Sequence, residues 1–173
     1  MDKNEPETGN PEALRSIVVV FSYHHGNTEK IANAGAKVLG AEGRTPRQGR
    51  PEEIAEYGLV GFGSGISSAT FDASILDLAD RLSALRERRP SSSRPTGPRP
   101  SLQTGSSSQK NHRQIREKLQ AKGYTVIGEF GCAGWNTNSF LHYFGGLNKG
   151  RPNAGDLGNA ETFARDMREK ARG

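Results

Sequence analysis

Apolar runs that predict β-strands alternate along this chain with stretches whose apolar residues recur at helical spacing. The clearest run is Ile17-Val18-Val19-Val20-Phe21, which is continuous and therefore typical of a parallel strand buried on both faces. We expect strands at 17–21, 44–47, 59–62 and 124–130, and helices or helical turns at 27–39, 51–57, 71–85, 112–122 and 160–170. This alternation predicts an α/β fold in which helices cover both faces of a parallel sheet.

The chain has the length and composition of a single domain. Its 173 residues suffice for one α/β domain, placed at 16–173, after a polar tail at 1–15 that is expected to be disordered. The sequence has one cysteine, Cys132, and no apolar run of the roughly 20 residues that a membrane helix requires. We therefore expect a cytoplasmic protein that has no membrane partner.

The positive charge of the chain is concentrated in one segment. Residues 86–99 contain five arginines and one glutamate, which gives +4 of the net +5, so the rest of the chain is near +1. A nucleic-acid-binding surface usually distributes lysine and arginine along the folded elements, often with aromatic residues between them. This distribution makes a nucleic-acid partner unlikely from the sequence.

The stretch Ser22-Tyr23-His24-His25-Gly26-Asn27-Thr28 joins the first strand to the first helix. The first amides of a helix lack intrahelical partners and attract an anion, while Ser22, Asn27 and Thr28 add polar side chains. Gly26 allows the backbone to approach a ligand closely. Asn27 or Thr28 serving only as a helix N-cap is the simpler alternative. Because no lysine follows the glycine and no GxGxxG motif is present, the loop predicts a cradle for a monophosphate rather than for a nucleoside triphosphate or a dinucleotide.

This loop resembles the flavin mononucleotide (FMN) phosphate loop of the flavodoxin family. Two further stretches, 58–66 and 145–153, resemble segments of small prokaryotic flavodoxin-like proteins. The resemblance implies a doubly wound parallel sheet with strand order 2-1-3-4-5 and FMN as the cofactor. It places the phosphate among the side chains and backbone of Ser22, His24, His25, Gly26, Asn27 and Thr28.

No apolar run occupies the place of strand 4 in this order. Residues 86–103 are rich in arginine, proline and serine, and proline donates no ladder hydrogen bond, whereas buried unpaired arginine is costly. We therefore expect an irregular segment at 86–103 and a disrupted strand 4. In a shifted reading frame, TCN serine codons and CGN arginine codons would encode mostly small and apolar residues, which suggests a local frameshift as the cause.

The remaining candidate site residues follow the other strands. Gly63, Ser64, Gly65 and Ile66 follow the strand that neighbours the first, and we expect them to contact the flavin ring mainly through backbone groups, although a flexible turn is the alternative. Three more residues are candidates on weaker grounds: Thr104 and Gly105 as a third flavin loop, and Trp135 as a ring that stacks on the flavin or covers the sheet edge. Cys132 is interpreted as a small core residue rather than a redox group.

No side chain in these stretches has the pattern of a general acid, base, nucleophile or metal ligand. The sequence therefore favours an FMN-binding electron-transfer protein that exchanges electrons with redox partner proteins. Two alternatives remain open. One is an FMN-dependent NAD(P)H or quinone reductase on the same fold, and the other is a degenerate domain without flavin whose arginine-rich arm binds nucleic acid.

Overall fold

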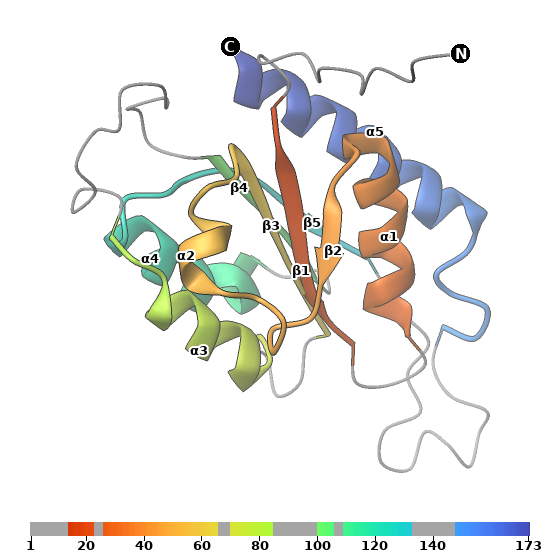
Figure 1. Ribbon diagram of the computed structural model, residues 1–173. Coiled ribbons are helices and arrows are strands. Elements are labelled where there is room, and N and C mark those ends of the chain that lie inside the picture. The colour runs from red at the N-terminus through yellow and green to blue at the C-terminus, as the bar shows by residue number, and fades with distance from the viewer. Residues whose placement is uncertain (1–13, 23–25, 66–69, 85–99, 106–108, 133–147) are drawn as a thin grey trace, which may run out of the picture.

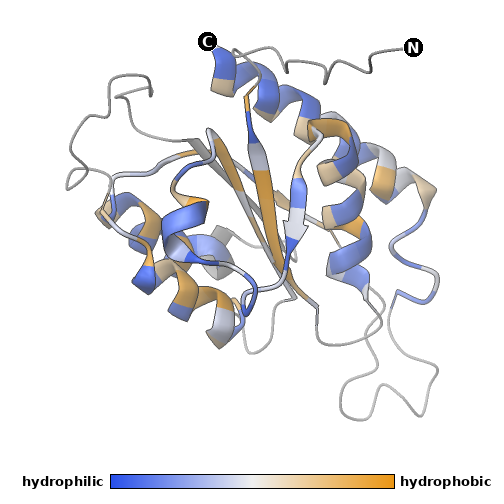
Figure 2. Cartoon of the chain, in the orientation of Figure 1, coloured by the Kyte–Doolittle hydropathy of each residue, from blue (hydrophilic) through white to orange (hydrophobic). Residues whose placement is uncertain are grey.

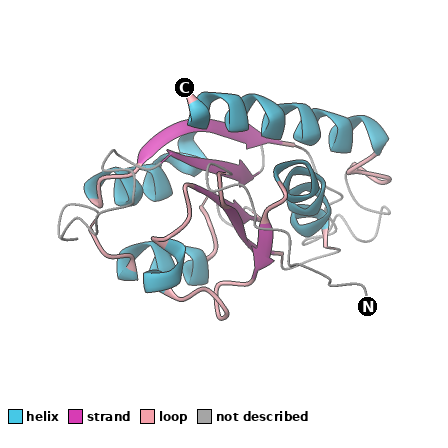
Figure 3. Ribbon diagram, turned by 45° about the horizontal axis from the view of Figure 1, so that its top comes forward, coloured by secondary structure: helices cyan, strands magenta, loops and turns pink. Residues whose placement is uncertain are grey.

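The computed structural model describes residues 14–22, 26–65, 70–84, 100–105, 109–132 and 148–173, which form a five-stranded parallel sheet covered by helices on both faces (Figures 1 and 3). The strand order is β2-β1-β3-β4-β5, so the predicted α/β class and the order 2-1-3-4-5 are confirmed. The strands are β1 (Ser16–Phe21), β2 (Glu42–Arg44), β3 (Leu59–Ser64), β4 (Pro100–Gly105) and β5 (Thr125–Gly131). The helices are α1 (Asn27–Leu39), α2 (Pro51–Ile54), α3 (Ala73–Arg81), α4 (Gln109–Ala121) and α5 (Ala154–Arg172).

Strands β1 and β3 form the apolar centre of the sheet. Alternate residues of β1 serve different faces: Ile17 and Val19 join Val60 and Phe62 in the core under α3 and α4, whereas Val18 packs against α1. All six residues of β3 are buried, which is why both strands read as continuous apolar runs. Figure 2 shows this contrast between the hydrophobic strands and the hydrophilic outer faces of the helices.

Helices α1 and α5 cover the opposite face of the sheet and pack closely against each other (Figure 1). A Cβ atom added to Gly35 of α1 would lie 3.6 Å from the Cβ atom of Ala164 on α5, so small residues bring the two helices together. Gly128 of β5 has the same effect under α5, because an added Cβ would lie 2.3 Å from the sulfur of Met167. A larger residue at Gly128 would force α5 away from the sheet.

A central strand 4 is present, so the expectation that it is disrupted is wrong. Pro100-Ser-Leu-Gln-Thr-Gly105 pairs in parallel with β3 on one side and with β5 on the other. The strand escaped the sequence analysis because Leu102 is its single aliphatic residue, and because Pro100 stands at its first position, where a ladder donor is not required. Because the strand is present, there is no missing strand for a frameshift to explain. Of the expected irregular segment at 86–103, residues 86–99 lie outside the described residues, and residues 100–103 belong to β4.

Several element boundaries also differ from the sequence prediction, and β2 and α5 have the clearest physical reasons. Strand β2 lies at Glu42–Arg44 rather than 44–47, because α1 ends at Gly40 in the left-handed conformation and the next residues enter the sheet at once. Helix α5 begins at Ala154 rather than Ala160. Its start is fixed by a capping box in which Asn153 accepts from the Asp156 amide and Asp156 accepts from the Asn153 amide.

Candidate functional site

The carboxyl ends of the three central strands meet at one edge of the sheet, and most of the predicted site residues lie there. Phe21 at the end of β1 is in register with Ser64 at the end of β3, and Gly63 is in register with Thr104 of β4. The parallel sheet therefore brings three segments that are far apart in the sequence to the same edge: Ser22 with 26–28, 63–65, and 104–105. Open α/β sheets bind their ligands at this edge, where the chain crosses from one face to the other.

Helix α1 begins at this edge without a side-chain cap. Its N-cap residue is Gly26, in the left-handed conformation with φ of 63°, so neither Asn27 nor Thr28 has the N-cap role of the simpler alternative. Two other helices, α3 and α5, show the contrast. Asp72 caps α3 by accepting from the Ser74 amide at 2.9 Å, and α5 has its capping box. The first turn of α1 thus receives no side-chain acceptor from its N-cap, an arrangement suited to an external anion.

Glycines at the end of β3 leave space beside the first turn of α1. A Cβ atom added to Gly63 would lie 3.2 Å from Val20 Cγ2 and 3.6 Å from Thr28 Cγ2. One added to Gly65 would lie 3.5 Å from the Thr28 hydroxyl oxygen, and the Gly65 amide donates to the Phe21 carbonyl at 3.2 Å. Side chains at these two positions would fill the space beside Thr28, so the glycines keep a cradle between the β1–α1 and β3–α3 connections.

Ser64 stabilises the β3–α3 connection from inside. The residue is fully buried, and its hydroxyl donates to the Gly65 carbonyl at 2.7 Å while accepting from the Asp72 amide at 2.8 Å. A further hydrogen bond attaches the far end of this connection to α4: the Thr70 hydroxyl donates to Gln114 Oε1 at 2.7 Å. Ser64 therefore positions the adjacent backbone, which is the part of this connection predicted to contact a ring.

Four predicted site residues lie outside the described residues: His24, His25, Ile66 and Trp135. Their assignments remain predictions. Thr104 and Gly105 are placed by their backbone at the end of β4, between Gly63 of β3 and the residues Phe130 and Gly131 of β5.

Cys132 follows β5 at the same edge and is partly buried. Burial raises the pKa of its thiol, and the nearby Asp156 carboxylate raises it further, whereas Arg151 lowers it. Because the thiolate is the reactive form of cysteine, this environment favours an unreactive thiol.

A polar cluster formed by His112, Arg116 and Glu129 was missed by the sequence analysis. Arg116 of α4 donates to both carboxylate oxygens of Glu129 on β5, at 2.7 and 2.8 Å, and this hydrogen bonding lowers the pKa of Glu129. His112, one turn earlier on α4, is 3% exposed, and its Nδ1 lies 3.4 Å from Glu129 Oε2. Its ring also meets the edge of Phe71 at a centroid distance of 5.5 Å.

A β-bulge explains why the sequence pattern does not reveal this cluster. Val126 and Glu129 are three residues apart, so regular alternation would place them on opposite faces of the sheet. The pairing of β5 with β4 shifts register between Ser101 and Leu102, and Val126 packs against the core under α4 while Glu129 binds Arg116 of α4. The sequence does show a glutamate within an otherwise largely apolar strand, but it does not indicate which residue pairs with that glutamate.

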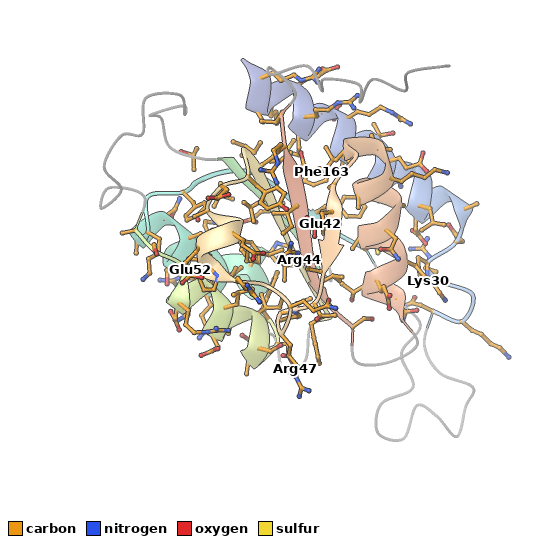
Figure 4. The ribbon with its side chains drawn as sticks, viewed as in Figure 1. Lys30, Glu42, Arg44, Arg47, Glu52 and Phe163 are labelled. Atoms are coloured by element: carbon orange, nitrogen blue, oxygen red, sulfur yellow. The ribbon has the colours of Figure 1, made fainter. Side chains whose placement is uncertain are left out.

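A second group of charged residues stabilises the β2 edge, away from the three central strand ends. Arg44 of β2 binds Glu42 at 2.7 Å (Figure 4), and it also binds Glu53 of α2. The Tyr57 hydroxyl donates to Glu42, which lowers the pKa of Glu42 and raises that of Tyr57. These contacts connect β2 to α2 and have a structural role.

A curated relative shows the family of the chain. The uncharacterized protein MJ0298 of Methanocaldococcus jannaschii is 35% identical over 154 residues, which cover 89% of this chain and 98% of the relative. The chain belongs to the same family as this archaeal protein. No protein-family model matches the chain.

Solved structures show that the chain has a flavodoxin-like fold. A flavodoxin from the domain Archaea superposes with a TM-score of 0.58 at 15% identity, covering 92% of this chain and 99% of the flavodoxin. Flavodoxin 2 of Bacillus cereus gives 0.60 at 14% identity, covering 90% and 99% of the two chains. Rubredoxin oxygen:oxidoreductase of Desulfovibrio gigas gives 0.60 at 13% identity over 91% of this chain but only 36% of the larger protein. Among the described residues, no helix is both long and apolar enough to cross a membrane.

Proposed function

We propose that this protein binds FMN at the carboxyl edge of its sheet and acts as an electron-transfer protein. The observation that carries the proposal is the cradle at the start of α1, where Gly26 provides no side-chain cap and Gly63 and Gly65 leave space beside Thr28. A phosphate monoester suits this cradle, because it accepts hydrogen bonds from helix amides and hydroxyls and carries the charge that the helix dipole favours.

The residues at this edge fit the two ends of FMN. The amides of the first turn of α1, with Ser22, Asn27 and Thr28, are suited to the phosphate, and the backbone at 63–65 and 104–105 is suited to the ring. Bound FMN supplies one- and two-electron transfer chemistry. The chain contributes binding, orientation and a restricted environment, and Ser64 keeps the ring-facing backbone in place through its two internal hydrogen bonds.

Electron transfer is favoured over group transfer by the residues beside the cradle. Among the described residues at this edge, most polar side chains are helix-capping, hydroxyl or amide groups; Glu29 in the first turn of α1 and Arg151 near Cys132 are charged, and Cys132 has a raised pKa. We further propose a cytoplasmic protein that exchanges electrons with protein partners. An NAD(P)H or quinone reductase would be recognised by catalytic oxidation of NAD(P)H by the flavin-loaded protein, and a nucleic-acid-binding domain by salt-sensitive DNA retention without bound flavin.

A pair of glycine substitutions tests the cradle directly. Gly65→Val places a side chain beside the Thr28 hydroxyl, whereas Gly43→Val on β2 is a matched control because nothing lies within 4 Å of an added Cβ there. We expect Gly65→Val to weaken FMN binding at least tenfold, measured by fluorescence titration of the apoprotein, while Gly43→Val binds like the unmodified protein. Equal affinities for the two variants, with melting temperatures unchanged, would contradict the assignment.

A further inference from the structure

His112 is a buried polar side chain whose second nitrogen has no hydrogen-bond partner among the described residues. Its side chain is 4% exposed, and Nε2 finds neither a donor nor an acceptor in the part of the chain that the structure describes. The opposite nitrogen, Nδ1, faces Glu129 Oε2 at 3.4 Å. An unpaired polar atom in such a position is costly, so a buried imidazole of this kind calls for an explanation beyond packing.

The surroundings of the ring fix its orientation and balance the nearby charge. Glu129 is held as a carboxylate by the two hydrogen bonds from Arg116, so the pair is neutral overall. The carboxylate favours a proton on Nδ1. In the neutral ring, Nε2 then carries the lone pair, and in the charged ring Nε2 carries the second proton. Phe71 meets the ring edge-on, at a centroid distance of 5.5 Å.

The charged groups on the other elements around the ring are already engaged. On α3, Asp72 accepts from Ser74, Asp77 binds Arg81, and Asp80 binds Lys118 of α4. Strand β4 contains no titratable residue, and its residue in register with Glu129 is Gln103. The charge that matters most to His112 is therefore that of Glu129, balanced by Arg116.

The ring also lies close to the proposed flavin site. Glu129 of β5, Gln103 of β4 and Phe62 of β3 share one register row, and each strand ends two residues later, roughly 7 Å further along the sheet. A second connection runs through the chain: Ser64 at the end of β3 accepts from the Asp72 amide, and the neighbouring Phe71 contacts His112. Charge that appears at the carboxyl edge thus acts on His112 across a short distance.

We infer that His112 is the proton-uptake site that accompanies reduction of the bound flavin. The inference rests on the proposed function. When an external electron donor adds negative charge at the carboxyl edge, one proton from water binds Nε2 of His112, so the imidazole becomes an imidazolium and no other bond changes. At about 10 Å and an effective dielectric constant of about 20, one unit of charge moves a titration by about one pH unit.

Two measurements on the FMN-loaded protein test this assignment. The chain has four histidines, so NMR signals of the His112 ring can be assigned with His112→Gln and followed against pH before and after anaerobic reduction with dithionite. We expect the pH at which the ring signals change to rise by about one unit on reduction. We also expect a bend in the plot of reduction potential against pH, and the bend should disappear in His112→Gln.

Two variants separate charge from packing. Glu129→Gln keeps the ring and removes the anion beside it, so the ring should titrate at lower pH in both oxidation states. Arg113→Gln removes a charge from an exposed position on the same helix, with 75% side-chain exposure, and should leave both measurements unchanged. A ring titration that is identical before and after reduction, in protein that binds FMN, overturns this inference alone. Absence of FMN binding overturns the proposed function as well.

Discussion

The two halves of the sheet are built differently. Strands β1 and β3 consist mainly of buried residues, and their interior position in the sheet fits their largely apolar composition. Strand β4 consists of Pro-Ser-Leu-Gln-Thr-Gly, yet it lies between β3 and β5 and pairs with both. Strand β5, at the edge beyond it, is half-buried along most of its length.

This difference shows that a polar strand can be held in the interior of a sheet by pairing with the strands on both sides. In the β1–β3 half, side chains that belong to the strands supply the hydrophobic stabilisation. In the β4–β5 half, the backbone ladder joins β4 to both of its neighbours, and the hydrogen bonds between Glu129 and Arg116 attach β5 to α4. The candidate site spans the junction, with the cradle on the apolar half and residues 104–105 on the polar half.

The largest effect on the free energy of unfolding is expected from a comparison of two residues that are in register across the junction. Phe62 of β3 is fully buried, and Gln103 of β4 is its partner. Phe62→Ala should lower the free energy of unfolding by about 3–5 kcal/mol, because it removes a large core side chain and leaves a cavity. Gln103→Ala should lower it by less than about 1 kcal/mol. Urea unfolding of both variants measures this, and equal losses would contradict the contrast between the halves.

An intermediate effect is expected for the ion pair between β5 and α4. Arg116→Ala should cost about 1–2 kcal/mol at pH 7, since the side chain of Arg116 is 33% exposed and that of Glu129 18%, and solvent screens part of the interaction. Arg116→Lys, which retains the charge but not the paired geometry, should lose less. The quantity to measure is again the free energy of unfolding.

The pH dependence of the same pair has a definite sign. Arg116 lowers the pKa of Glu129 below its ordinary value of 4.5. A carboxyl group whose pKa is lowered by folding stabilises the native state above its unfolded pKa, and this contribution disappears as the pH falls through the lowered value. The stability difference between the unmodified protein and Arg116→Ala should therefore be constant from pH 7 to about 5 and shrink below pH 4.5. A difference that persists at pH 2 would assign the loss to packing.

The smallest effect tests whether β4 can be improved by apolar side chains. Ser101 is in register with Val60 on one side and Val126 on the other, and both valines belong to or pack against the main core. Ser101→Val should raise the melting temperature, with a gain of up to about 1 kcal/mol, because β-branched residues favour strands between apolar neighbours. A decrease would show that this position in β4 does not tolerate an apolar side chain.

The sequence predicted the parts of the molecule whose own residues determine their structure. Helix α1 was predicted with the bounds that it has, and β1 and β3 within two residues, because their apolar patterns are strong. Strand β4 was missed because pairing on both sides compensates for its polar composition. The start of α5 was missed because the capping box at Asn153 lies ahead of the apolar pattern.

The candidate site could be predicted in part for the same reason. The β1–α1 loop and the glycines after β3 carry a local signal, and the parallel topology brings them together. Two features needed the tertiary structure. One is that the Ser64 hydroxyl makes both of its hydrogen bonds within the β3–α3 connection. The other is the polar cluster at His112, which depends on a bulge in β5 that no local sequence pattern indicates.

The central claim is that the first turn of α1 binds the phosphate of FMN, and a comparison of FMN with riboflavin tests it most directly. Titration of the apoprotein, followed by quenching of flavin fluorescence, should show FMN binding at least a hundredfold more tightly than riboflavin, which lacks the phosphate. Thr28→Ala should reduce this preference by about 1.5–3 kcal/mol, because a hydrogen bond to a charged group is lost. Equal affinities for FMN and riboflavin in the unmodified protein would contradict the account.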